Sequence, residues 1–350
     1  MRHSLLLGLC AAVVLTVVLA VISTTPALAE EEPAVTTVEV GRHRVSGPYV
    51  HKNLAVYVVR GEDSVAGKTF MTLDEALGQE LAVVHETSNV QELSVENRSD
   101  DVHLYIQSGV IVKGGKQDRT IRYDMILPPN SGRVPIASFC VESGRWGQRG
   151  DESAAGFSGG AANLPMLELR SAVRIEGSQQ AVWENVRKAQ EELGRNLGDE
   201  VRAPESATSL QLTLESPRVR ESAAEYVEAL TGVFADKPDA IGFAFAINGE
   251  MNTVDIYGSS ALFRKLLPAL LDAGAVEAIA RHDAEKEFEA PTPDAVRDLM
   301  RDAEEGEATE RDLTHGARMT VKQSENNALF RVFNSAEPDA VYRLEIMNRK

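Results

Sequence analysis

The chain has 350 residues and a formal net charge of −17, from 36 Lys and Arg against 53 Asp and Glu. This excess of negative charge keeps a protein soluble and repels phosphate backbones, which excludes nucleic acid as a partner. There are two cysteines, and Cys10 lies in an N-terminal apolar run. If that run is removed, Cys140 alone remains, and neither an internal disulfide nor a zinc site of several thiolates can form.

Residues 1–29 have the order of a secretory signal peptide. The start is basic, residues 5–22 carry no charge, and Ala27-Leu28-Ala29 offers small residues at the positions that a signal peptidase reads. We expect cleavage before Glu30 and a secreted or periplasmic protein. The alternative is an N-terminal membrane anchor, because the apolar run approaches the length of a spanning helix. Either way, the folded part faces outward from the cytoplasm.

The rest of the chain predicts an α+β fold, with a strand-rich N-terminal half followed by a helix–β-hairpin–helix half. Up to residue 141, short β-branched runs alternate apolar and polar residues between Gly, Pro and Asn, for example residues 120–127 and 134–141. Thr72 is a plausible N-cap of one short helix among them. We divide the mature chain into a polar lead and first strand (30–47), one α+β domain (48–285) and a C-terminal extension (286–350).

In the second half the apolar period shifts toward that of helices. Residues 143–164 are rich in Gly, Ser and Ala and predict a long loop. Asn248-Gly249 between two apolar runs is a strong hairpin signal. The predicted helices cover residues 179–193, which Gly194 ends, then 221–234, 259–271 and 291–305, and terminal strands are expected at 319–323, 329–333 and 341–347.

Three short patterns have more ordinary explanations. Residues 61–69 resemble a phosphate-binding loop, but five residues separate the glycines where the motif has four. Ser158 sits in a Gly-x-Ser-x-Gly pattern without the strand before it and the helix after it that a nucleophile elbow requires. The histidines of the mature chain are scattered without a pair at ligand spacing. We expect neither a metal nor a cofactor.

A glycine turn carries the first informative cluster, in residues 113–119 (KGGKQDR). Gly114-Gly115 between two strand-like runs predicts a tight turn, because glycine adopts positive φ without steric cost. Lys113, Lys116 and Arg119 gather there on an otherwise acidic protein. The turn is either a solvated loop with an Asp118–Arg119 surface pair, or a pocket in which cations and amides bind an anion.

The second cluster lies where residues 138–146 (SFCVESGRW) leave a strand and enter the Gly-rich loop. Alternation places Cys140 and Glu142 on one face of that strand, and Arg145 and Trp146 at its exit. Cys140 has no histidine near it in sequence that could act as a base, so we interpret it as a small buried side chain. Trp146 is interpreted as core or as a lid under the loop, and Glu142 and Arg145 could pair with each other.

These strings together resemble a known family. TLDEAL (residues 72–77), KGGKQDR, the Pro128-Pro129 turn and CVESGRW (residues 140–146), with the later 242–249 and 254–263 stretches, are similar to the ARG- and rhodanese-phosphatase-superfamily-associated protein domain. The similarity covers about residues 48–285. The family is a domain of unknown function, so the resemblance implies no activity or ligand. It implies that the two strings belong to one site or to one structural nucleus.

Three functions remain open from sequence. The first is a domain of the cell envelope that binds a small anionic ligand or an envelope protein. Its ligand-binding residues would be Lys116, Gln117, Asp118, Arg119, Arg145 and Trp146, with Glu142 beside them. The second is a hydrolase of an anionic substrate, with Glu142 or Asp118 as general acid–base and the arginines holding the anion. The third is a structural scaffold in which both strings form core turns.

Overall fold

A computed structural model describes residues 35–349, apart from the side chains of residues 160 and 161. The expected signal peptide lies outside these described residues. The fold is mixed α+β, with three sheets and with most of the helices in the middle of the chain. Within residues 35–349, no helix combines the length and the apolar character needed to span a membrane.

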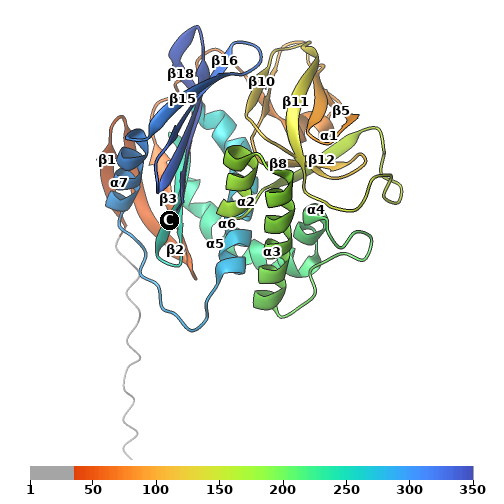
Figure 1. Cartoon of the computed structure of the whole chain (residues 1–350). Coiled ribbons are helices and arrows are strands. Elements are labelled where there is room, and N and C mark those ends of the chain that lie inside the picture. The colour runs from red at the N-terminus through yellow and green to blue at the C-terminus, as the bar shows by residue number, and fades with distance from the viewer. Residues whose placement is uncertain (1–34, 350) are drawn as a thin grey trace, which may run out of the picture. The chain divides into compact units, whose positions relative to one another are not determined.

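The largest sheet has nine antiparallel strands and joins the first and last described segments of the chain (Figure 1). Pairing of β18 with β14 places residues 337–348 inside this sheet. The region after residue 286 therefore completes the sheet with four of its strands. The hydrogen-bonded order is β1 (Thr36–Val40), β2 (His43–His51), β3 (Leu54–Arg60), β13 (Ala240–Ile247), β14 (Glu250–Tyr257), β18 (Glu337–Asn348), β17 (Asn327–Asn334), β16 (Ala317–Gln323) and β15 (Glu307–Asp312).

The centre of this sheet is the predicted hairpin, which is confirmed. Asn248 and Gly249 have φ of 53° and 79°, the left-handed pair that matches the twist of a two-residue hairpin. Alternation along β13 gives the sheet two apolar faces. Phe243 and Phe245 belong to one buried cluster, whereas Ala244 belongs to a second on the opposite face.

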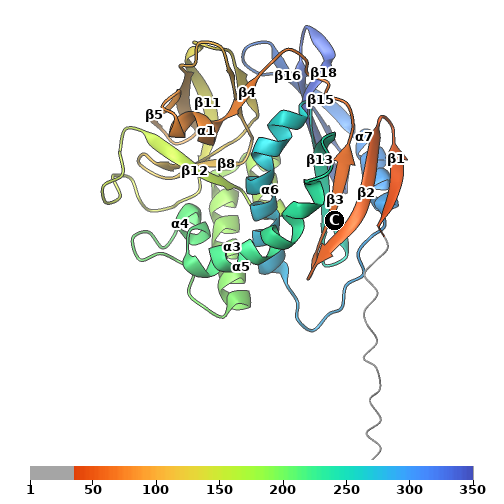
Figure 2. The same ribbon diagram turned by 180° about the vertical axis from the view of Figure 1, so that it is seen from behind.

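Helices cover both faces of the large sheet. The cluster that contains Phe243 is closed by α3, α5 and α6, and the opposite cluster is closed by α7 (Figures 1 and 2). The helical elements are α1 (Leu73–Gly78), α2 (Leu167–Ser171), a π-helical turn η1 (Ala172–Glu176), α3 (Gln179–Leu197), α4 (Leu210–Leu214), α5 (Pro217–Thr231), a 3₁₀ turn η2 (Gly232–Phe234), α6 (Ser260–Arg281) and α7 (Pro293–Glu304).

Two helices run further than the sequence predicts. Gly194 does not end α3, because the helix continues to Leu197 and closes at Gly198 with φ of 64°. The helix expected over residues 259–271 extends to Arg281, with Pro268 inside it. Nearly all residues of its last two turns are buried, and this burial outweighs the local cost of proline and glycine.

Two smaller sheets and α1 enclose a third apolar cluster. The run expected as one strand over residues 120–127 is split between them, because the chain turns at Asp124 into the protein interior. The Gly-rich segment 143–164 also differs from the expected loop, since its last part is strand β12. The six-stranded order is β12 (Phe157–Asn163), β8 (Val110–Gly114), β9 (Arg119–Ile121), β11 (Gly132–Cys140), β6 (Glu92–Asn97) and β5 (Ala82–Asn89), and the three-stranded order is β10 (Met125–Leu127), β7 (His103–Ile106) and β4 (Phe70–Thr72).

Candidate functional site

The candidate residues from sequence divide between two neighbouring places. Gln117, Asp118, Glu142 and Arg145 meet in a buried cluster of carboxylates and arginines beside the turn after β8. Lys116, Arg119 and Trp146 lie together on another side of that turn. The two strings are thus adjacent in space, as the family resemblance implies.

Glu142 is the centre of the buried cluster, since its side chain is inaccessible to solvent. Arg145 donates to both of its carboxylate oxygens, from Nε at 2.7 Å and from Nη2 at 2.6 Å. The Asp118 backbone N–H donates to Oε2 at 3.0 Å, and Ser206 Oγ to Oε1 at 2.5 Å. This bidentate geometry fixes the loop after β11 against the turn after β8.

Asp118 is equally buried and holds a second arginine, Arg149, which the sequence did not single out. Arg149 donates to the two Asp118 oxygens at 2.9 and 3.0 Å and to Glu142 at 3.3 Å. Ser209 Oγ at 2.6 Å and the Gly114 N–H at 3.0 Å complete the set. The alternative of a solvated loop with an Asp118–Arg119 surface pair is wrong, because both side chains are buried and pair with other residues.

The protonation of Glu142 follows from these contacts. Burial raises the pKa of the carboxyl group, but the hydrogen bonds from Arg145 and Ser206 outweigh burial and leave the pKa below its ordinary value. A carboxylate that is ionised and bound by two guanidinium groups has no proton to donate and is poorly placed to accept one. The cluster has the chemistry of an internal ionic anchor.

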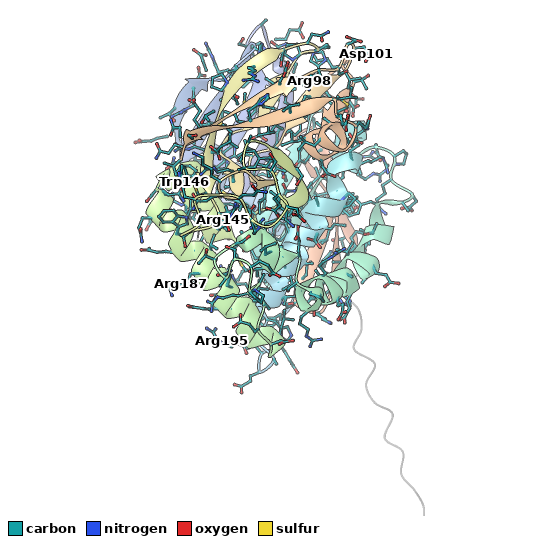
Figure 3. All side chains as sticks on the ribbon, turned by 90° about the vertical axis from the view of Figure 1, so that its right-hand side faces the viewer. Arg98, Asp101, Arg145, Trp146, Arg187 and Arg195 are labelled. Atoms are coloured by element: carbon teal, nitrogen blue, oxygen red, sulfur yellow. The ribbon has the colours of Figure 1, made fainter. Side chains whose placement is uncertain are left out.

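Arg119 lies on the other side of the turn with its side chain buried. It contacts Glu86 at 3.4 Å and donates to the Cys140 sulfur. Burial raises the pKa of the Cys140 thiol to about 11, so the thiol is protonated and poorly nucleophilic, and the interpretation as a buried side chain is confirmed. Trp146 is 49% exposed at the edge of the view in Figure 3, with Lys116 Nζ 5.0 Å from its ring centre, so it is neither core nor lid.

Ser158 lies within strand β12, paired with Lys113 of β8. A nucleophile elbow is a sharp turn between a strand and a helix, and this serine is in an extended segment instead. Its hydroxyl is exposed and donates to the Lys113 carbonyl at 3.3 Å. Ser158 is therefore not at a nucleophile elbow, and the segment is a strand rather than the flexible turn that the sequence predicts.

A second charge cluster, which the sequence did not single out, lies between the large sheet and the helices. We call it the central charge cluster. Arg343 on β18 donates to Asp255 through Nε and Nη2, both at 2.8 Å, and to Asp124 at 2.9 Å. Arg174 contacts Asp124 at 3.3 Å and also pairs with Glu345. Its members are four acids and three arginines, Asp124, Asp255, Glu277, Glu345, Arg170, Arg174 and Arg343.

Arg174 is held by the π-helical turn η1 between α2 and α3. A π turn widens the helix by one residue per turn and occurs often at functional sites. The neighbouring Met166 has φ of 58°, an unusual value for a residue with a long side chain. Buried charges, a π turn and a left-handed residue therefore coincide in one region.

Beside this cluster is a small inner cavity of about 40 Å³, with room for about three water molecules. An outer groove of about 900 Å³ lies between α1 and β12 on one side and α5 and α6 on the other, and Figure 2 shows these helices toward the viewer. Gln107 and Asn163 line both spaces, so the cavity and the groove are neighbours. The groove is within the size range of small-molecule sites.

The two shared amides are buried polar groups of the groove. Gln107 is 5% exposed, and its buried Oε1 lacks a hydrogen-bond partner within the described part of the chain. Asn163 is 9% exposed and lines the same two spaces. The Nε groups of Arg170 and Arg174, next to the cavity, also lack a partner within residues 35–349. Buried polar groups without partners are costly, and their convergence on one space is typical of a ligand or water site.

The sequence contained a partial signal for this region. Asp255 in a strand of apolar residues, and Arg343 with Glu345 at alternating positions of the last strand, are charges where burial is expected. Gln107 and Asn163 gave no such signal in the sequence, because a polar residue near the end of a strand is common. No group of His, Cys, Asp and Glu among residues 35–349 is arranged to hold a metal ion.

The fold and these two clusters define an α+β domain with a large antiparallel sheet and a groove against its helical face. The chain belongs to the ARG and Rhodanese-Phosphatase-superfamily-associated Protein domain family, whose model matches residues 42–341. The match reaches 56 residues beyond the span of 48–285 inferred from sequence motifs and includes the start of β18. No curated protein and no solved structure matches the chain.

Proposed function

We propose that this protein is a non-enzymatic binding domain of the cell envelope, and that its ligand occupies the outer groove. The observation that carries the proposal is the pair of buried amides, Gln107 and Asn163, where the groove meets the inner cavity, with Gln107 Oε1 unpartnered among the described residues. An amide side chain both donates and accepts hydrogen bonds, so the pair suits a polar group of a ligand. Apolar side chains, among them Leu73, Leu214 and Leu266, would cover the remainder of the ligand.

For the cluster around Glu142 we propose the scaffold role. Its carboxylates are occupied by Arg145 and Arg149, which leaves no free cation to hold an anionic ligand and no free carboxylate for acid–base chemistry. Lys116 and Trp146 remain accessible nearby and could contact a partner protein. The hydrolase alternative finds its best remaining support elsewhere, in the groove carboxylate Asp272, whose pKa burial raises.

A blocking substitution tests the groove. Ala224 on α5 is exposed and lines the groove, whereas Ala229 on the same helix is exposed and does not. A thermal-shift screen of small amides, amines and carboxylates is expected to give compounds that raise the melting temperature, because a ligand of the native state stabilises it. Ala224→Trp should abolish those shifts and Ala229→Trp should retain them. If no compound raises the melting temperature, or if the increases persist in Ala224→Trp, the groove is not the binding site.

The proposed location in the cell envelope is inferred from the N-terminal sequence and is tested separately. N-terminal sequencing of the protein recovered from its native host is expected to begin at Glu30, because the Ala27-Leu28-Ala29 site precedes that residue. Recovery of the intact N-terminus in a membrane fraction would support the anchor instead. Recovery of the intact chain in the cytosol would reject export altogether.

A further inference from the structure

The charges around the outer groove are unequal. Six acidic or basic side chains line it, namely Asp74, Glu75, Glu215, Asp272, Arg220 and Lys265. Glu75 already binds Lys265 at 2.9 Å, and Glu215 binds Lys113 at 2.6 Å. The remaining acids are Asp74 and Asp272, with Arg220 as the remaining cation. The groove thus has an excess of negative charge after its internal pairs are formed.

Asp272 is the acid best placed to meet a ligand. It is partly buried on α6, and within residues 35–349 it forms no hydrogen bond and no ion pair, although the charge of Arg220 acts on it. Burial raises the pKa of this carboxyl group because its charged form loses solvation. A partly desolvated carboxylate without a partner is stabilised by any cation that reaches it.

The central charge cluster, which lies behind the groove, also has an excess of negative charge. The central charge cluster contains four carboxylates and three guanidinium groups, and Gln107 and Asn163 stand between it and the groove. With a net charge of −17 for the whole chain, the field in a low-dielectric groove attracts cations and repels anions. The apolar walls, which include Val110, Leu214 and Leu266, require a ligand with an apolar body.

We infer that the ligand of the groove is a small organic cation with an apolar body, such as an alkylammonium compound. Its cationic group lies at Asp272 and its body along the apolar walls of α1, α5 and α6. The inference rests on the proposed binding function and narrows it to a ligand class. The inferred ligand is a cation, whereas the Lys113–Arg119 turn led us to expect an anion. The cations of that turn are paired or lie outside the groove.

Three probes with one six-carbon chain separate charge from shape: hexylammonium, hexanamide and hexanoate. We expect calorimetric titration to detect hexylammonium, with at least tenfold weaker binding of the other two. Asp272→Asn should weaken hexylammonium at least tenfold and leave hexanamide unchanged. Glu228→Gln is the matched control, because Glu228 is exposed on α5 outside the groove. Asp272→Asn removes an unpartnered carboxylate and should unfold at the wild-type temperature or above it.

The outcomes distinguish the two proposals. Hexanamide or hexanoate binding as tightly as hexylammonium, with all binding lost in Ala224→Trp, would overturn the cation inference and leave the groove as the seat. Equal effects of Asp272→Asn and Glu228→Gln would overturn the role of Asp272. Binding of hexylammonium that persists in Ala224→Trp, or no binding of any probe, would overturn both proposals.

Discussion

Replacement of Glu142 by Gln tests whether the buried carboxylate–arginine cluster holds the fold together. The carboxylate accepts five hydrogen bonds, two from Arg145 and one each from Arg149, Ser206 and the Asp118 N–H. Glutamine keeps one acceptor oxygen but turns an amide donor toward at least two of these donors. It also leaves the arginines with one buried anion where there were two.

Loss of one partner of a buried ion pair costs about 3–5 kcal/mol. Because Asp118 still pairs with Arg149 and Arg145 is slightly exposed, we expect the lower end, about 3 kcal/mol of unfolding free energy. The assay is urea unfolding at pH 7, followed by circular dichroism. Glu191→Gln is the control, since the exposed Glu191–Arg187 pair is worth at most about 0.5 kcal/mol.

The same variant has a defined pH dependence. The folded pKa of Glu142 lies below its ordinary value, so the carboxylate contributes its full stability above the unfolded pKa of about 4.3. That contribution is lost as the pH falls through the folded pKa. The difference between wild type and Glu142→Gln should therefore narrow below about pH 4. A stable variant with less than about 1 kcal/mol of loss at pH 7 would refute the scaffold role.

Three further predictions concern single positions. Cys140 is the one cysteine of residues 33–350, and burial raises the pKa of its thiol to about 11. It should therefore react only slowly with a maleimide at pH 8 until urea unfolds the protein, and rapid labelling of the native protein would contradict this. Gly115→Ala should lower the unfolding free energy by more than about 1 kcal/mol, because φ of Gly115 is 55° and the new Cβ would lie 2.3 Å from the Phe157 ring. An unchanged midpoint of urea unfolding would contradict this. Thr72→Ala should cost about 1 kcal/mol, since Thr72 and Glu75 form a capping box at α1; loss within error would contradict it.

Local features of this protein could be predicted from its sequence because they depend on neighbours in the chain. The Asn248-Gly249 turn and the Thr72 cap are confirmed, and α3 and α7 begin within two residues of their predicted starts. Helix ends were less predictable. The last two turns of α6 are stabilised by burial against other elements, and Pro268 and Gly274 alone would indicate an earlier end.

The tertiary structure alone decided which charges are free. Lys113 and Arg119 belong to a cationic turn in sequence, yet Lys113 pairs with Glu215, 102 residues away, and Arg119 pairs with Glu86, 33 residues away. The pair of Glu142 and Arg145, three residues apart, could be predicted from their own string and is confirmed. The two long-range pairings follow no local periodicity, and so the sequence could not distinguish an anion site from an internal anchor.

By itself the sequence determined the mixed α+β composition, the family and a buried, unreactive Cys140. The reason is that the hydrophobic period, the turn residues and the motif strings each depend on residues close together in the chain. Only the tertiary structure decided that residues 307–348 complete the sheet begun by residues 36–60, and that Gln107, Asn163 and Asp272 meet at one groove. The physical reason is that sheet pairing and groove walls join segments more than 100 residues apart, and only the folded chain brings them into contact.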